Sequence, residues 1–324
     1  MIITRTPFRV SFCGGGTDMP NHYRTNGGCV VSTTIDKYVY ITYARSFHRN
    51  LAILKYSTVE TTDDLDFVKH PIFREVLQKY KVMGAEINST SNIPAGTGLG
   101  SSSTFSVGLI NAVRTMKKLP VTKQILAKEA CEIEIDRLEG PIGKQDQYAA
   151  AYGGLNFIRF NKDDTVDIEP ISLTPEDKKR MSDNLLMFYL GGTRNASRIL
   201  RKYNGDTPEV TSKKNELSKM TERLRDELNN GNIDYLGKNL DEGWKIKKAF
   251  SKEVSNSTID DIYDVAMNNG ASGGKLLGAG GNGFMLFYVE KDNQNSVRKA
   301  LSNYREMIFD FDETGSKVVF NDDY

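Results

Sequence analysis

The first half of the chain is rich in short apolar or alternating segments, a pattern typical of β-strands. Residues 39–43, Val-Tyr-Ile-Thr-Tyr, combine β-branched and aromatic side chains, which pack well on the surface of a sheet. A glycine turn precedes a similar segment near residue 155. The predicted strands are Arg9–Cys13, Cys29–Thr34, Tyr38–Ala44, Glu86–Ser91 and Gly153–Phe160.

Two helices are predicted after the fourth of these strands, over Ser102–Lys118 and Thr122–Leu138. Thr122 is suited to cap the second helix, because its hydroxyl can accept a backbone N–H of the first turn. Gly140 and Pro141 mark the end of that helix. The first helix begins directly after a glycine-rich loop, so the loop and the helix are considered together below.

The second half has a different balance, with long helices and few strands. Two of its helices are separated by an Asn-Asn-Gly-Asn segment at 229–232, and Gly270 is suited to end a third. We place a domain boundary near residues 170–185, where Pro170, Pro175 and a charged run intervene. The predicted elements are strands Leu185–Leu190, Phe284–Val289 and Lys317–Phe320, and helices Glu209–Asn230, Ile233–Phe250, Asp260–Asn269 and Ser296–Tyr304.

Composition narrows the classes of partner. The 324 residues carry a formal net charge of +1, which gives no global field for nucleic acid or membrane. The three cysteines include no Cys-x-x-Cys pair, which argues against a disulfide framework, and the three histidines lack zinc-ligand spacing. No segment is typical of a secretory signal or of a bilayer span. We therefore expect a cytoplasmic protein without nucleic-acid or membrane partners.

The glycine-rich loop at residues 94–104 reads Pro-Ala-Gly-Thr-Gly-Leu-Gly-Ser-Ser-Ser-Thr. Glycines allow the backbone to approach an anion and to turn its N–H groups toward it. The N-terminus of the following helix adds unpaired N–H donors and the positive end of a dipole. Serine hydroxyls in this position can cap the helix, bind phosphate or ligate a metal ion. The loop therefore indicates a nucleotide-dependent enzyme.

Two further glycine clusters lie at 13–18, Cys-Gly-Gly-Gly-Thr-Asp, and at 278–283, Gly-Ala-Gly-Gly-Asn-Gly. The last matches the dinucleotide-binding pattern, but a strand rather than a helix is predicted after it, which excludes that interpretation. The chain lacks the companion motifs of protein kinases. The loop at 94–104 lacks the Walker lysine. One cluster alone is better explained by a tight turn with positive φ, whereas three of them favour a ligand site.

Taken in order, three segments resemble the motifs of the GHMP kinases, which include galactokinases, homoserine kinases and mevalonate kinases. They are Thr6-Pro-Phe-Arg9 with Gly-Gly-Gly-Thr-Asp18, then Pro94-x3-Gly98-Leu-Gly-Ser-Ser102, then Gly278-Ala-Gly-Gly-x-Gly283. The resemblance implies a two-domain α+β fold with the active site in the cleft between the domains. The N-terminal domain, 1–180, would be ribosomal protein S5 domain 2-like and would carry the phosphate-binding loop, and the C-terminal domain, 181–324, would be ferredoxin-like.

The resemblance also implies phosphorylation of a small molecule by ATP with Mg²⁺. The glycines before Asp18, together with Pro20 and Tyr23, are most similar to the heptose 7-phosphate kinase branch. Such enzymes phosphorylate the anomeric hydroxyl of a seven-carbon sugar phosphate, for nucleotide-activated heptose and surface polysaccharide. Alternatives are a kinase for fucose, galactose or an N-acetylhexosamine, or a catalytically silent binding regulator. A homodimer is an open expectation.

Catalytic roles follow from the same resemblance. Asp146, in Gly143-Lys-Gln-Asp-Gln, matches the general base that faces the reacting hydroxyl, although a plain helix-capping aspartate is the alternative. Arg9 matches a cation near the transferred phosphoryl group, and Lys144 is a second candidate cation. Ser102 and Glu134 match the ligands of Mg²⁺. Helix register in the sequence does not separate Glu134 from Glu132, which stays open as the rival ligand.

The binding residues form two sets. The nucleotide set is Pro94, Gly96, Gly98, Leu99, Gly100, Ser101, Ser102 and Ser103. The substrate set is Gly15, Gly16, Thr17, Asp18, Gly143, Arg194, Arg198, Gly280 and Gly281. Arg194 and Arg198 are four residues apart on a predicted helix and would hold the sugar phosphate, with a solvated surface helix as the alternative. Galactokinases have Glu-His where Gly15-Gly16 stands here, which disfavours galactose.

Overall fold

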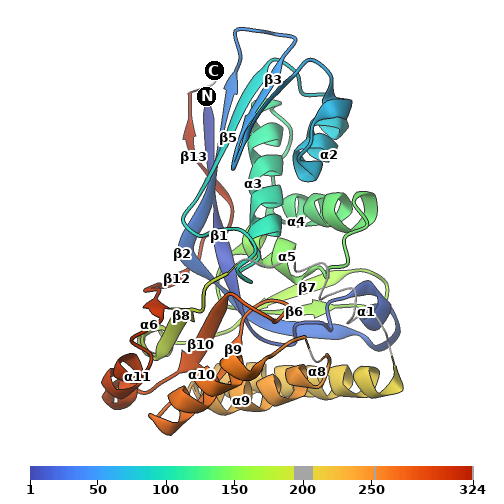
Figure 1. Ribbon diagram of the computed structural model, residues 1–324. Coiled ribbons are helices and arrows are strands. Elements are labelled where there is room, and N and C mark those ends of the chain that lie inside the picture. The colour runs from blue at the N-terminus through green and yellow to red at the C-terminus, as the bar shows by residue number, and fades with distance from the viewer. Residues whose placement is uncertain (193–206, 252, 323–324) are drawn as a thin grey trace.

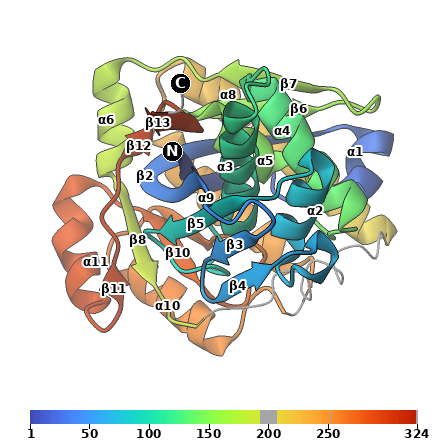
Figure 2. The same ribbon diagram turned by 90° about the horizontal axis from the view of Figure 1, so that it is seen from above.

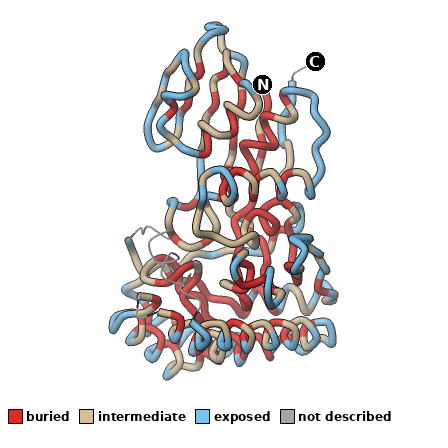
Figure 3. Tube along the Cα trace, turned by 90° about the vertical axis from the view of Figure 1, so that its right-hand side faces the viewer, coloured by how far each residue is buried: buried red, intermediate tan, exposed pale blue. Residues whose placement is uncertain are grey.

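The structure is a computed structural model that describes residues 1–192, 207–251 and 253–322. Figure 1 shows a tall first sheet with helices packed beside it, and a layer of further helices across the lower end of the molecule. A second, smaller sheet lies between these two parts. Buried apolar residues form one cluster that includes members of both sheets, and Figure 3 shows these residues running along the interior of the body.

The first sheet is built around two long strands, β1 (Ile2–Cys13) and β2 (Gly28–Arg45), which pair antiparallel. Its order is β13-β1-β2-β5-β3-β4, while β6 and β12 pair with β2 and β7 pairs with β6. The two strands expected over 29–44 are one strand of 18 residues, because β1 pairs with both halves of it across a shift in register near Pro7. The other strands are β3 (Ala52–Lys55), β4 (Val59–Thr62), β5 (Ala85–Ser91), β6 (Asn156–Phe160) and β7 (Val166–Pro170).

Helix α3 (Ser101–Met116) packs against β1 and β2, and Figure 2 shows α2, α4 and α5 around it. Nearly all of its residues are buried, which explains its apolar sequence. The expected helix over 122–138 is confirmed in position and consists of α4 (Lys123–Cys131) followed by a π-helical turn, Glu132–Arg137. Thr122 caps it, its hydroxyl accepting the Ile125 N–H at 3.1 Å. The remaining helices of this part are α1 (Pro20–Asn26), α2 (Pro71–Tyr80) and α5 (Gln145–Tyr152).

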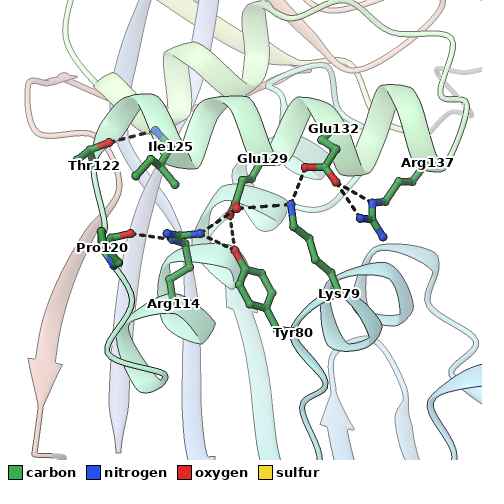
Figure 4. Close-up of polar contacts among 9 residues, drawn as sticks. All are labelled: Lys79, Tyr80, Arg114, Pro120, Thr122, Ile125, Glu129, Glu132 and Arg137. Carbon is green, nitrogen blue, oxygen red and sulfur yellow. Dashed lines mark hydrogen bonds and ion pairs between the residues drawn. The ribbon is translucent and has the colours of Figure 1, made fainter.

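A polar cluster joins α2, α3 and α4 (Figure 4). Glu129 of α4 receives Arg114 of α3 at 2.8 Å and also the Tyr80 hydroxyl of α2. Glu132 receives the Lys79 ammonium at 2.5 Å and the Arg137 guanidinium at 2.9 Å. These contacts hold the end of α4 and the start of the π-helical turn, which contains Glu134.

The second sheet has the order β11-β8-β10-β9. Strands β9 and β10 pair antiparallel and are joined by the glycine cluster at 278–283, so the rejection of a dinucleotide-binding unit is confirmed. Helix α9 packs against β9 and β10, and α8 packs against α9 and β2. The strands are β8 (Leu185–Tyr189), β9 (Gly273–Leu276), β10 (Phe284–Tyr288) and β11 (Arg305–Glu306). The helices are α6 (Pro175–Asp183), α8 (Pro208–Asn229), α9 (Tyr235–Lys248), α10 (Ser257–Asn268) and α11 (Gln294–Ala300).

The end of the chain returns to the first sheet. Strand β12 (Phe311–Asp312) pairs with β2, and β13 (Lys317–Asn321) pairs with β1. Figure 1 shows both termini at the same end of this sheet. The second half of the chain thus contributes its last two strands to the first sheet. The division of the chain into two domains at residue 180 remains a prediction.

Candidate active site

A cavity with a volume of about 440 Å³ lies among the described residues. Strand β1, the glycine-rich loop and the 138–146 segment line one side of it, and α8, α9 and β9 contribute the other. Residues far apart in the sequence, such as Arg9, Ser102 and Lys275, therefore line one cavity. This cavity is the place where the glycine clusters at 13–18 and 94–104 meet.

The glycine-rich loop opens α3 without a side-chain cap among the described residues. Gly100, at the N-cap position, has a φ of 79°, in the left-handed region that favours glycine. Three residues of the loop (Gly96, Gly98, Gly100) and the three serines 101–103 line the cavity. A helix N-terminus with free N–H donors is an anion-binding site, so the loop fits the phosphates of a nucleotide.

Two members of the predicted nucleotide set, Pro94 and Leu99, do not line the cavity. Pro94 is exposed and does not line the cavity, and Leu99 is fully buried. The Leu99 carbonyl accepts the Arg9 N–H at 3.2 Å, which anchors the loop to β1. Leu99 therefore holds the loop in place rather than contacting a ligand in the cavity.

Arg9 and Asp146 form a bidentate ion pair beneath the loop. Arg9 Nε and Nη2 donate to the two Asp146 carboxylate oxygens at 2.7 and 2.8 Å. The third contact of the guanidinium, Nη1 to the Gly98 carbonyl at 2.8 Å, ties the pair to the loop. Arg9 is 5% exposed and Asp146 is 22% exposed, so the carboxylate is the accessible partner. The structure thus brings the predicted base and the predicted cation together next to the phosphate loop.

The Asp18 side chain contacts the backbone at the first residue of α5. Its Oδ1 accepts the Gly16 N–H at 2.8 Å and its Oδ2 accepts the Gln145 N–H at 3.2 Å. A Cβ on Gly143 would lie 2.0 Å from Asp18 Oδ2, so the chain passes too closely for any side chain at that position. Burial raises the pKa of Asp18, and the charge of Asp146 raises it further. Asp18 thereby sets the position of Asp146, the predicted base, in the first turn of α5.

Gly15 and Gly16 line the cavity beside Asp18, whereas Thr17 does not. The Thr17 hydroxyl is buried and donates to the carbonyls of Gly14 and Cys29 at 2.8 and 2.9 Å. Thr17 therefore closes the turn between β1 and α1 and is a structural residue.

Glu134 is buried and faces the serines of α3. The Ser102 hydroxyl donates to Oε1 at 2.6 Å, and the Gln147 amide donates to Oε2 at 2.9 Å. Burial raises the pKa of Glu134, and the negative charge of Asp146 raises it further. Hydrogen bonds from the serines act in the opposite direction and lower it. A cation beside this carboxylate would favour its ionised form. The two adjacent oxygens, with phosphate and water oxygens, fit a Mg²⁺ ion.

The rival ligand, Glu132, points elsewhere. It lies outside the cavity lining and is neutralised by Lys79 and Arg137 (Figure 4). Partial burial acts to raise the pKa of Glu132, but these two cations outweigh it and lower the pKa. The π-helical turn that begins at residue 132 carries Glu134 to the cavity face. The geometry therefore favours Glu134 as the ligand.

Lys144 does not lie beside the base. Its ammonium contacts Asp164 Oδ1 and carbonyl oxygen, each at 3.1 Å, and lies 4.7 Å from the centre of the Tyr23 ring. It is absent from the cavity lining. The side chain instead contacts the β6–β7 turn and α1, so the structure does not bring Lys144 to the predicted base, and its catalytic role stays a prediction.

Asp164 is a pH-sensitive member of this contact. Its partial burial acts to raise the pKa of the carboxyl, but hydrogen bonds from Tyr23, Lys144 and Arg24 outweigh it and lower the pKa to about 2. A carboxyl whose pKa is lowered on folding stabilises the fold at pH values above its usual pKa of 3.8, and this contribution is lost as the pH falls toward 2. We expect Asp164→Asn to reduce the stability difference between pH 5 and pH 3, measured by urea unfolding. An unchanged difference would contradict this assignment.

The glycine cluster at 278–283 contacts the glycine-rich loop at 94–104. Gly278 and Ala279 line the cavity, whereas Gly280 and Gly281, expected in the substrate set, pack on Val254. The Gly281 N–H donates to the Val254 carbonyl at 2.9 Å, and a Cβ on Gly283 would lie 2.3 Å from the Thr97 carbonyl. Gly280 and Gly281 thus pack outside the cavity lining, and their substrate role stays a prediction. Gly283 brings the second sheet against the phosphate loop.

Several lining residues were missed by the sequence reasoning. Ser11 Oγ and Gln145 Oε1 are buried without a hydrogen-bond partner, and both lie near Gly15. Alternation along β1 places Ser11 on the same face as Arg9, which was a usable signal. Lys275 of β9 also lines the cavity. Arg194 and Arg198, the predicted phosphate ligands, lie outside the described residues.

An α+β fold of two sheets, with an uncapped glycine-rich helix start above a carboxylate–arginine pair, defines a small-molecule kinase. The sequence matches the GHMP kinases N terminal domain over residues 66–154 and the GHMP kinases C terminal domain over 224–307. The chain belongs to the GHMP kinase family.

Similar proteins include a D-glycero-alpha-D-manno-heptose 7-phosphate kinase of Campylobacter jejuni, 30% identical over 98% of each chain. A galactokinase of Pyrococcus furiosus is 27% identical over 93% of this chain and 92% of its own. The fold is similar to the crystal structure of a D-glycero-D-manno-heptose 1-phosphate kinase from Bacteroides thetaiotaomicron, with a TM-score of 0.80, 24% identity and 99% of each chain covered. No described helix is both long and apolar enough to cross a bilayer.

Proposed function

We propose that this protein is a cytoplasmic, ATP- and Mg²⁺-dependent sugar kinase that phosphorylates the anomeric hydroxyl of D-glycero-D-manno-heptose 7-phosphate. The observation that carries the kinase reaction is the Arg9–Asp146 pair beneath the start of α3. The heptose acceptor is supported by the Campylobacter relative, which spans nearly the whole chain. The product would be a 1,7-bisphosphate for nucleotide-activated heptose and surface polysaccharide.

Bound ATP would supply the phosphoryl group, and Mg²⁺ at Glu134 and Ser102 would neutralise phosphate charge. The N–H groups at the start of α3 would bind the phosphates, and Arg9 would stabilise the charge that develops on the transferred group. Asp146 would accept the proton of the sugar hydroxyl as its oxygen bonds to phosphorus. The proton thus ends on the carboxylate and the phosphoryl group on the sugar.

The acceptor would lie between β1 and α5. Ser11 Oγ and Gln145 Oε1 are unsatisfied polar atoms on this wall, and a buried polar atom without a partner costs free energy. Sugar hydroxyls would supply the missing hydrogen bonds. Gly15 and Gly16 leave room for the sugar where galactokinases carry larger side chains.

A second candidate is an anomeric kinase for an unphosphorylated sugar such as galactose, fucose or an N-acetylhexosamine. The galactokinase relative favours it, since it also spans most of the chain. A silent binding regulator is disfavoured, because Asp146, Glu134 and Ser102 are all present and face one cavity.

ADP release by the purified protein separates these candidates. The assay would compare the heptose 7-phosphate with the unphosphorylated heptose, galactose, fucose and an N-acetylhexosamine. We expect efficient turnover with the heptose 7-phosphate alone. Preferred turnover of an unphosphorylated sugar would establish the second candidate, and binding of ATP and sugar without ADP release would establish the regulator.

A further inference from the structure

Lys275 is a buried cation that the phosphoryl-transfer step does not use. It lies on β9 and is only 8% exposed, yet its side chain lines the cavity. Its ammonium donates to the Phe12 carbonyl at 2.8 Å, and no carboxylate of the described residues lies within ion-pair distance. An ammonium has three donors, so one carbonyl leaves it unsatisfied. A buried charge without a counter-ion is costly, which points to an anion that arrives with the ligand.

The position of Lys275 separates it from the nucleotide. Phe12, its partner, lies three residues beyond Arg9 on β1, or about 10 Å along an extended strand. The phosphate loop contacts β1 at Arg9, through Leu99 and Gly98. The carbonyl that Lys275 contacts is therefore about 10 Å along β1 from the residue that the phosphate loop contacts, which is about the length of one sugar phosphate.

The surroundings of Lys275 add positive charge. Lys214 of α8 and Lys247 of α9 line the same side of the cavity. Lys247 is itself held by the carbonyls of Leu276 and Gly278, at 3.1 and 2.5 Å, which places it next to the glycine cluster at 278–283. Burial lowers the pKa of Lys275 to about 8, the Cys13 thiol acts to raise it, and Arg9 lowers it. A bound dianion would favour the charged amine.

We propose that Lys275 binds the non-reacting phosphate of a monophosphorylated sugar acceptor, with Lys214 and Lys247 completing the cationic wall. The inference rests on the proposed function and deepens it, because it assigns the recognition of the second phosphate to β9. Ser11 and Gln145 line the same cavity, each with a buried oxygen that lacks a hydrogen-bond partner, and they would meet the sugar hydroxyls. The lysines would thus bind the phosphate end of the acceptor, and Asp146 and Arg9 would meet the end that carries the anomeric hydroxyl.

The test is isothermal titration calorimetry of the heptose 7-phosphate and of the unphosphorylated heptose, together with steady-state kinetics. We expect Lys275→Met to raise the Kd and KM of the phosphorylated sugar by about tenfold or more, the usual effect of losing a charged hydrogen bond. The KM for ATP and the affinity for the unphosphorylated sugar should be unchanged. Lys275→Arg, which keeps the charge, should recover part of the affinity.

Lys245→Met is the matched control, since Lys245 is also a lysine of the α9 region but is 67% exposed and paired with Asp241. It should change neither affinity. Equal losses for both sugars in Lys275→Met, or no loss, would overturn the proposal. The wild-type protein gives a test that does not depend on folding of a variant: equal affinity for the two sugars would also overturn it. Turnover of a different phosphorylated sugar would refute only the heptose assignment and leave Lys275 with its role.

Discussion

Asp146→Asn should abolish turnover while the protein still folds and binds ATP. The asparagine keeps the size of the side chain and one oxygen that can accept a hydrogen bond from Arg9, but it has no carboxylate to accept the proton. Loss of a general base lowers kcat by about 10²- to 10⁴-fold. Calorimetric ATP binding should stay at the wild-type value, because the phosphate loop contacts the pair through Arg9 rather than through Asp146.

A companion variant distinguishes proton transfer from structure. Asp146→Ala removes both carboxylate acceptors of the Arg9 guanidinium, which is almost fully buried and would be left without its counter-ion. We expect it to lose stability as well as activity, in contrast to Asp146→Asn. Retained turnover in Asp146→Asn would refute the assignment of the base.

Glu134→Gln should lower kcat strongly and raise the Mg²⁺ concentration that is needed for half-maximal rate. The amide keeps an oxygen near Ser102 but loses the charge that a hard cation requires. Disturbing a ligand or its immediate support commonly costs about 10- to 100-fold in metal affinity or activity. The measurement is a Mg²⁺ titration of the initial rate at fixed ATP in excess.

Glu132→Gln is a matched control two residues away in the same helical segment. Its carboxylate contacts Lys79 and Arg137 and does not reach the cavity, so the Mg²⁺ dependence should stay that of the wild-type protein. Only the free energy of unfolding should fall. A Mg²⁺ effect in Glu132→Gln that exceeds the effect in Glu134→Gln would reverse the assignment.

The long elements were predictable because local pattern and burial agree in them. Helix α3 follows the glycine-rich loop as expected, and α8 and α9 carry regular apolar faces. The continuity of β2 was not predictable, since the polar Asp36-Lys37 pair in its middle lies where the pairing with β1 shifts register, between Pro7–Tyr38 and Phe8–Ile35. The return of β13 to β1 was hidden because it joins residues about 315 positions apart.

The site shows the same limit at the level of single residues. Arg9, Asp146 and Ser102 could be proposed as site residues from the sequence because the segments that contain them resemble motifs of the GHMP kinases. The choice between Glu132 and Glu134 required the π-helical turn, whose register the sequence pattern does not reveal. Lys144 was misplaced because its neighbour Asp146 suggested proximity, whereas its side chain points to Asp164. Lys275 carried a signal that was overlooked, namely a lysine within a short, fully buried strand.

The central claim is that this site transfers a phosphoryl group to the anomeric hydroxyl of a phosphorylated sugar. Phosphorus NMR of the products formed from ATP and the heptose 7-phosphate tests it directly. The account predicts ADP and a new phosphate resonance coupled to the anomeric proton, with the 7-phosphate resonance retained. A phosphate on any other carbon, or no new sugar phosphate with active ATP binding, would contradict it.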